Sequence, residues 1–177
     1  PRYILTGGPG VGKTTLMKAC AARGYQTVPE AYAVLYEQAT CSNNLATFFN
    51  DPVSLYARIL EKQIALESAL DEKVIAFLDR SAVDILAFAQ FFNVSLSADI
   101  CEHINRRHYD GIFLLDPLPI HLYKQCAQRK ETYDQALDIH ALLKEVYRQG
   151  GYAQKIIHVP FGTVDERIAY ILNHLET

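Results

Sequence analysis

The chain has 177 residues, 50% of them hydrophobic and 21% charged, with a formal net charge of −3 at pH 7. These values are typical of a globular protein with one substantial core, and we assign residues 1–177 to a single domain. The slightly negative charge disfavours a general nucleic-acid binder. No apolar run approaches the roughly 18 residues that a membrane span needs.

The cysteines are scattered, without a C-x-x-C pair or a neighbouring histidine at ligand spacing: Cys20, Cys41, Cys101 and Cys126. This pattern predicts reduced thiols, and we see no signal-like segment before the first strand, so we expect a cytoplasmic protein. The 6 histidines follow no ligand spacing either. We interpret each of them as a surface or core side chain.

The most informative stretch is residues 2–15, where a short apolar strand, a glycine-rich turn and a helix start follow one another. The turn contains G-x-x-x-x-G-K-T, a phosphate-binding loop (P-loop). Its backbone N–H groups can wrap a phosphate, Lys13 can lie along the β- and γ-phosphates, and the Thr14 hydroxyl can ligate Mg²⁺. The residues predicted to bind the nucleotide are Gly7, Gly8, Pro9, Gly10, Val11, Gly12, Lys13, Thr14 and Thr15.

Apolar runs then alternate with helical patterns along the rest of the chain. Further strands are predicted at 25–28, 74–78, 112–115 and 156–159, and helices at 14–23, 31–38, 52–71, 82–92, 98–107, 119–129, 133–150 and 164–175. This alternation predicts an α/β P-loop NTPase fold. We expect a three-layer sandwich with a five-stranded, mainly parallel sheet and helices on both faces.

Local signals set several boundaries. Residues 40–50 are polar and broken, so we expect a flexible loop there. The predicted capping boxes are Thr132 with Gln135, Thr163 with Glu166 and, with Asp in the acidic place, Ser81 with Asp84.

Ligands of parallel sheets bind where the strands end, so the residues after each strand are the candidate site. Asp79 ends a fully apolar strand and is predicted to hold Mg²⁺. Arg80 follows it where mechanical ATPases carry a second acid that activates water. An arginine cannot act as a base, but it can hold a phosphate and stabilise charge during transfer. Glu30, after the second strand, can accept the proton of an acceptor hydroxyl.

Other patterns narrow the class. There is no N-K-x-D or T-K-x-D for guanine recognition, and no D-x-x-G switch follows a strand. Residues 128–130, with Arg129 and Lys130, could close over the phosphates as a lid. The loop 160–163 could read the base through backbone groups, which leaves ATP and GTP both open.

The chain resembles the AAA-type ATPase/kinase family of the ribosylnicotinamide kinase domain and is similar to deoxynucleoside kinases. The resemblance rests on segments 7–15, 28–31, 77–81, 113–117 and 158–172. It implies that Glu30 is the general base, that Asp79 and Arg80 form the metal and phosphate pair, and that Arg129 is the lid arginine. It also implies that Gln63 reads a base or amide edge. The chain departs from the pattern in lacking an arginine shortly after Glu30.

The leading hypothesis is therefore ATP·Mg²⁺-dependent phosphoryl transfer to a hydroxyl of a small molecule, nucleoside-like or another metabolite. The alternative is a nucleotide-binding regulatory module, or a slow ATPase or GTPase, whose bound state is read by a protein partner. Transfer to a nucleic-acid end is disfavoured by the acidic net charge.

Overall fold

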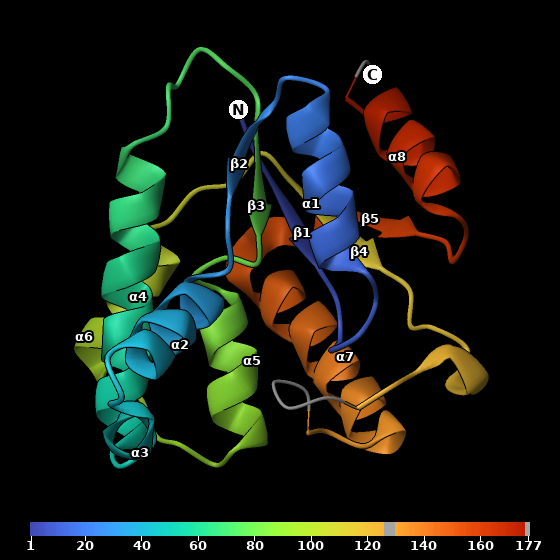
Figure 1. The fold of residues 1–177 in the computed structure, drawn as a ribbon. Coiled ribbons are helices and arrows are strands. Elements are labelled where there is room, and N and C mark those ends of the chain that lie inside the picture. Colours follow the sequence, from blue (N-terminus) through green and yellow to red (C-terminus); the bar gives the residue numbers. More distant parts are fainter. Residues whose placement is uncertain (126–129, 176–177) are drawn as a thin grey trace.

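A computed structural model of the chain describes residues 1–125 and 130–175. Its centre is a five-stranded sheet in the order β2-β3-β1-β4-β5. The strands are β1 (Arg2–Thr6), β2 (Gln26–Val28), β3 (Ala76–Asp79), β4 (Gly111–Leu115) and β5 (Ile156–Val159). Every neighbouring pair is parallel. The predicted sheet and its strand count are therefore confirmed, and all the carboxyl ends of the strands share one edge (Figure 1).

Helices cover both faces of this sheet (Figure 1). They are α1 (Lys13–Ala22), α2 (Ala31–Cys41), α3 (Leu45–Phe48), α4 (Pro52–Ser68), α5 (Asp84–Phe91), α6 (Ala98–Asn105), α7 (Tyr133–Tyr147) and α8 (Val164–Asn173). Short non-α turns lie at η1 (Ile120–Leu122), η2 (Arg148–Tyr152) and η3 (Ala153–Lys155). The sandwich thus has the three predicted layers.

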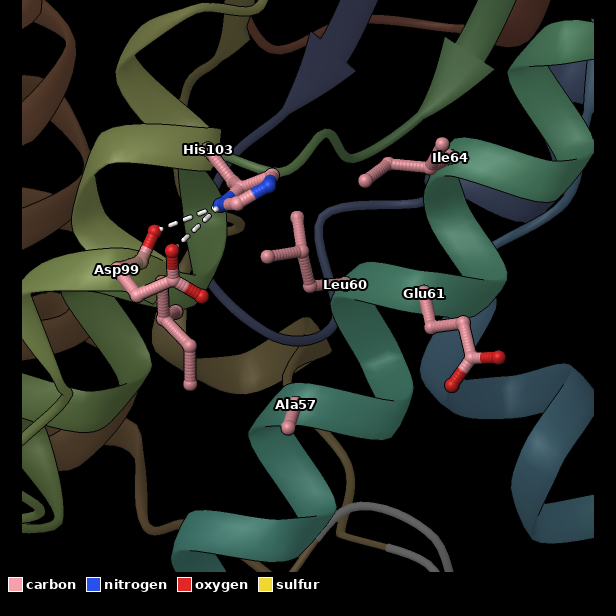
Figure 2. A pocket seen from close by; sticks show the side chains of 7 residues that line it. Ala57, Leu60, Glu61, Ile64, Asp99 and His103 are labelled. Carbon is pink, nitrogen blue, oxygen red and sulfur yellow. Dashed lines mark hydrogen bonds and ion pairs between the residues drawn. The ribbon is translucent and has the colours of Figure 1, made fainter.

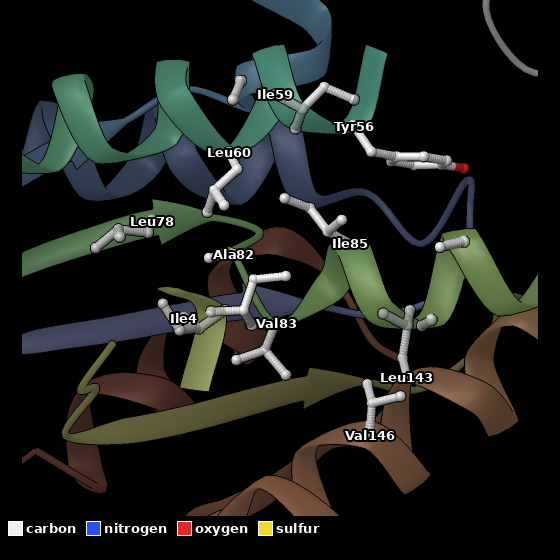
Figure 3. Close-up of a cluster of buried hydrophobic side chains, with 14 of the residues drawn as sticks. Ile4, Tyr56, Ile59, Leu60, Leu78, Ala82, Val83, Ile85, Leu143 and Val146 are labelled. Atoms are coloured by element: carbon white, nitrogen blue, oxygen red, sulfur yellow. The ribbon is translucent and has the colours of Figure 1, made fainter. Parts of the chain in front are cut away.

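Alternate side chains of each central strand divide the core in two. Ile4 and Leu78 belong to the larger cluster, which is formed with α2, α4, α5 and α7 (Figure 3). Leu5 and Phe77 belong to the other cluster, with α1 and α8. These strands are apolar on both faces because helices cover both.

Several predicted caps are present. Thr132 with Gln135 and Thr163 with Glu166 form complete capping boxes at the starts of α7 and α8. The predicted box at Ser81 and Asp84 is wrong. The Ser81 hydroxyl accepts from the Val83 N–H, while the Asp84 carboxylate turns into the interior.

Two predicted segments also differ from the structure. Within residues 40–50, α2 continues to Cys41 and α3 occupies Leu45–Phe48, because buried Phe48 anchors the segment to the core. The helix expected from Pro119 is only the turn η1 up to Tyr123, where the backbone becomes extended. The rest of that predicted helix includes residues 126–129, which lie outside the described residues.

None of the helices in the described part of the chain combines the length and the apolar character that crossing a bilayer requires.

A buried carboxylate joins several elements at the amino-terminal edge of the sheet. Glu67 of α4 is fully buried and accepts hydrogen bonds from Arg107 (2.6 Å), Arg2 (3.1 Å), Tyr109 (2.9 Å) and Gln63 (2.8 Å). The amide of Gln63 is therefore committed to Glu67, at the edge opposite the P-loop. The structure does not bring Gln63 to a base-reading position.

We expect Glu67→Ala to lower the free energy of unfolding by about 3 kcal/mol, the low end for breaking a buried ion pair. The low end applies because the Arg2 and Arg107 side chains are 26% and 23% exposed and keep contact with water. Denaturant titration measures the change. Glu61→Ala, at an exposed position of the same helix, is the control and should change stability by less than about 0.5 kcal/mol. Equal effects of the two changes would contradict the prediction.

Candidate active site at the carboxyl ends of the strands

The P-loop connects β1 to α1 and packs tightly against the protein. Gly12, the residue before α1, has a φ of 87°, which side chains other than glycine rarely adopt. A Cβ on Gly8 would lie 2.6 Å from the Ala136 carbonyl oxygen of α7. All the predicted nucleotide-binding residues lie in this loop and the first turn of α1, as the motif requires.

Lys13 is the first residue of α1 and is only 8% exposed. Burial, followed by the charge of Arg80, lowers its pKa to about 8, although Asp79, Glu30 and Asp84 act in the opposite direction. These charges act on one another because the carboxyl ends of the parallel strands lie side by side. The structure thus brings together four of the five predicted catalytic residues. The fifth, Arg129, lies outside the described residues and stays a prediction.

Asp79 ends β3, in register with Leu5 of β1, and is 7% exposed. Burial is the largest influence on this carboxyl and raises its pKa to about 6, against the attraction of Lys13. Its Oδ1 has no hydrogen-bond partner within the described part of the chain. A buried carboxylate oxygen without a donor fits a hard cation such as Mg²⁺, which prefers oxygen ligands and keeps phosphate and water ligands. Thr14, exposed at the start of α1, offers a hydroxyl for the same ion.

Arg80 has an unusual backbone, with a φ of 66° that is strained for a residue with a side chain. Its Nε lies 3.4 Å from Glu30 Oε1, an ion-pair distance without hydrogen-bond geometry, and its Nη1 donates to Asp84 Oδ2 at 3.0 Å. The guanidinium also lies over the Phe88 ring, 4.8 Å from its centroid. Burial alone would lower the pKa of Arg80, but Glu30 and Asp84 together raise it. Glu30 and Arg80, two of the predicted catalytic residues, therefore form an ion pair that the sequence did not predict.

The structure adds buried polar residues that the sequence analysis missed. Thr6 Oγ1 donates to Asp84 Oδ2 at 2.7 Å, and the Tyr147 hydroxyl donates to Asp84 Oδ1. Tyr147 also shares a 2.6 Å hydrogen bond with the Ser81 hydroxyl. The helical spacing of Asp84 four residues after Arg80 gives no reliable signal, because Arg80 lies in the turn before α5.

His140 of α7 also contacts the P-loop. Its Nδ1 accepts the Gly8 backbone N–H at 3.4 Å, and burial lowers its pKa. The sequence predicts only a surface or core side chain here, because no spacing points to the contact. Through Tyr147 and His140, α7 holds both the Arg80 turn and the phosphate loop.

The loop after β5 lies beside the P-loop. Arg167 of α8 donates to the Val11 carbonyl oxygen at 2.6 Å. A hollow of about 150 Å³ is lined by Pro160, Phe161, Gly162, Glu166, Arg167 and Tyr170. The lining of this hollow includes most of the loop predicted to read the base.

A larger hollow of about 280 Å³ lies between α4 and α6 (Figure 2). Leu60, Ile64 and His103 are among its lining residues, and the His103 ring bonds to Asp99 (Figure 2). None of the residues that line it belongs to the P-loop or to the Arg80 cluster.

A glycine loop that follows the central strand of a parallel sheet, with an acid at the end of the neighbouring strand, defines a P-loop NTPase fold. A family model described as an AAA domain matches residues 2–167. The chain therefore belongs to this AAA-domain family. No curated protein sequence matches the chain.

Several solved kinase structures share the fold. A NadR protein in complex with NAD and AMP-PNP is 21% identical, with a TM-score of 0.70, over 99% of this chain and 48% of its own. This chain thus spans about half of that protein. Deoxyadenosine kinase from M. mycoides is 14% identical (TM-score 0.67), and the match covers 99% of this chain and 98% of the kinase. Thymidylate kinase from Ehrlichia chaffeensis is 11% identical (TM-score 0.71), with the same shares covered.

The raised pKa of Asp79 has a consequence for stability. Since the folded protein holds this proton more tightly than the unfolded chain, ionisation costs stability as pH rises from about 4 to about 6, and the cost is fully present at pH 7. We expect Asp79→Asn to raise the melting temperature of the nucleotide-free protein at pH 7 by a few degrees, as about 1 kcal/mol gives about 2–4 °C at this size.

Differential scanning fluorimetry from pH 4 to pH 8 measures this effect. The gain of Asp79→Asn should shrink toward pH 4, where the native carboxyl is neutral. Asp138→Asn, at an exposed position of α7, is the control and should leave the melting temperature unchanged. A lower melting temperature of Asp79→Asn at pH 7 would refute the expectation.

Proposed function

We propose that the protein transfers the γ-phosphoryl group of ATP, in the presence of Mg²⁺, to a hydroxyl of a nucleoside-like small molecule. The observation that carries this proposal is the contact between Glu30 and Arg80 beside Lys13. An ATPase that activates water needs a free base next to the metal acid, and this position holds an arginine. A carboxylate paired with that arginine suits an organic hydroxyl as acceptor instead.

The nucleotide phosphates bind the P-loop amides and Lys13 in this proposal. Thr14 and Asp79 hold the Mg²⁺ ion, which neutralises phosphate charge when bound. The base enters the hollow beside Phe161 and Tyr170. Arg129 and Lys130 close over the phosphates. ATP is the expected phosphoryl donor. GTP is the other candidate, because the loop 160–163 is expected to recognise the base through backbone groups.

In the transfer step the acceptor hydroxyl oxygen bonds to the γ-phosphorus while the bond from that phosphorus to the bridging oxygen of ADP breaks. Glu30 takes the hydroxyl proton. Lys13 and Arg80 stabilise the negative charge on the transferring group. The products are ADP and a phosphate monoester.

Aromatic side chains lie near Glu30. Tyr32 follows Glu30 closely in α2, and its ring centroid lies 5.7 Å from that of Phe48. Burial raises the pKa of Tyr32 to about 12, and the charge of Glu30 is the next largest cause. Burial likewise raises the pKa of Tyr56 to about 12, with Tyr32 as the next largest cause. The Phe49 ring, 50% exposed, packs on Phe48. An aromatic wall beside the proposed base favours a planar ring such as a nucleobase or pyridine.

The solved relatives support this acceptor class. NadR structures hold NR or NAD, and a deoxyadenosine kinase structure holds dCMP and dCDP. The test is to incubate the chain with ATP·Mg²⁺ and a panel of nucleosides and pyridine ribosides, and to measure ADP and free phosphate. Acceptor-dependent ADP without free phosphate supports the kinase. Slow hydrolysis that no acceptor stimulates overturns it in favour of a regulatory NTPase.

We expect Glu30→Gln to lower the transfer rate by about 10²-fold or more, since the amide cannot take the hydroxyl proton, while the affinity for nucleotide changes little. Steady-state kinetics and nucleotide titration measure the two effects. Glu37→Gln, at an exposed position of the same helix, is the control and should transfer phosphate at the native rate. Unchanged turnover of Glu30→Gln would remove Glu30 from the mechanism.

A further inference from the structure

We propose that Asp84 is a positioning residue that holds Arg80 toward the γ-phosphate and keeps it from pairing fully with Glu30. This inference rests on the proposed phosphoryl transfer. Asp84 does not end a strand, and the sequence favoured a helix-capping role for it. Its importance follows from what its two carboxylate oxygens contact.

Both oxygens of Asp84 are occupied by donors from different elements. Oδ2 accepts from Arg80 Nη1 at 3.0 Å and from the Thr6 hydroxyl at 2.7 Å. Oδ1 accepts from the Tyr147 hydroxyl of α7. Asp84 is 2% exposed, so water does not compete for these bonds. A carboxylate fixed by β1 and α7 is a rigid anchor for the guanidinium.

Arg80 is held at one end and left unsatisfied at the other. The Nη1 end is bonded to Asp84, the ring of Phe88 covers one face, and the backbone N–H donates to the Leu5 carbonyl at 3.0 Å. Its Nε is buried without a hydrogen-bond partner in the described part of the chain. Glu30 is near but not bonded, at 3.4 Å. A buried donor without an acceptor favours an incoming anion such as a phosphate oxygen.

The charge of Asp84 therefore has a specific effect. Without it, the carboxylates that still act on Arg80 within the described residues are Glu30 and Asp79, which the proposed reaction needs as base and metal ligand. Arg80 would then be drawn toward Glu30 and away from the phosphate. The Ser81 hydroxyl, bonded to Tyr147 at 2.6 Å, fixes the phenol that orients Asp84.

The test compares the affinities for AMP-PNP, which has a γ-phosphate, and ADP, which lacks one, by calorimetry with Mg²⁺ and without turnover. Native protein should bind AMP-PNP more tightly than ADP. Asp84→Asn keeps the shape but removes the charge, and we expect about tenfold weaker AMP-PNP binding with ADP affinity within twofold. Asp138→Asn on α7 is the matched control and should bind both nucleotides as the native protein does.

A double-mutant cycle identifies the route of the effect. In an Arg80→Ala background, Asp84→Asn should cause no further loss of AMP-PNP affinity. Equal losses for both nucleotides, additive losses in the cycle, or no native preference for AMP-PNP would overturn the inference. If Asp84→Asn does not fold, Thr6→Val is the second variant, because it removes one hydrogen bond to Asp84 and keeps the charge. It should weaken AMP-PNP binding about threefold. An unchanged preference of Thr6→Val for AMP-PNP over ADP also overturns the inference.

The outcome is separable from that of the proposed function. A chain that transfers phosphate to no acceptor but follows this affinity pattern would refute the kinase and support the role of Asp84. If the protein transfers phosphate to an acceptor but Asp84→Asn leaves its preference for AMP-PNP over ADP unchanged, the kinase is supported and the role of Asp84 is refuted.

Discussion

The structure depends on charged side chains that gather at the carboxyl ends of the strands, four of them buried and Glu30 partly exposed: Lys13, Glu30, Asp79, Arg80 and Asp84. Burying one of these charges alone would cost several kcal/mol, so each must have an opposite charge nearby. Parallel strands meet this requirement because their carboxyl ends lie side by side. Lys13 follows β1, Glu30 follows β2, and the other three groups lie at the end of β3 or just after it. The two apolar clusters on either face of the sheet keep this edge rigid.

Much of the fold was predictable because its signals are local. Apolar runs marked the strands, and the capping boxes at Thr132 and Thr163 marked two helix starts. The errors arose where distant contacts overrode local composition. Buried Phe48 orders a polar stretch that reads as a loop. After Pro119, none of the described residues 120–125 is buried, so no packing there supports the predicted helix.

The candidate site was predictable where a residue type is tied to a position in a motif. Lys13, Asp79 and Arg80 follow from the P-loop and from the end of an apolar strand. Asp84, Tyr147 and His140 were missed because their roles come from pairs far apart in the chain. Asp84 and Tyr147 are 63 residues apart, and His140 and Gly8 are 132 apart. A local pattern also offered a simpler role for Asp84, as a helix cap.

Under the proposed function, the buried and partly unsatisfied charges would make the stability of the folded state depend on bound nucleotide and Mg²⁺. Phosphates and a cation would satisfy Arg80 Nε and Asp79 Oδ1, which lack partners within the described residues of the ligand-free chain. A ligand at 100 times its dissociation constant adds about 2.7 kcal/mol to the stability of a folded protein. Resistance to proteolysis, and with it the lifetime of the protein in the cell, would then rise and fall with the supply of nucleotide.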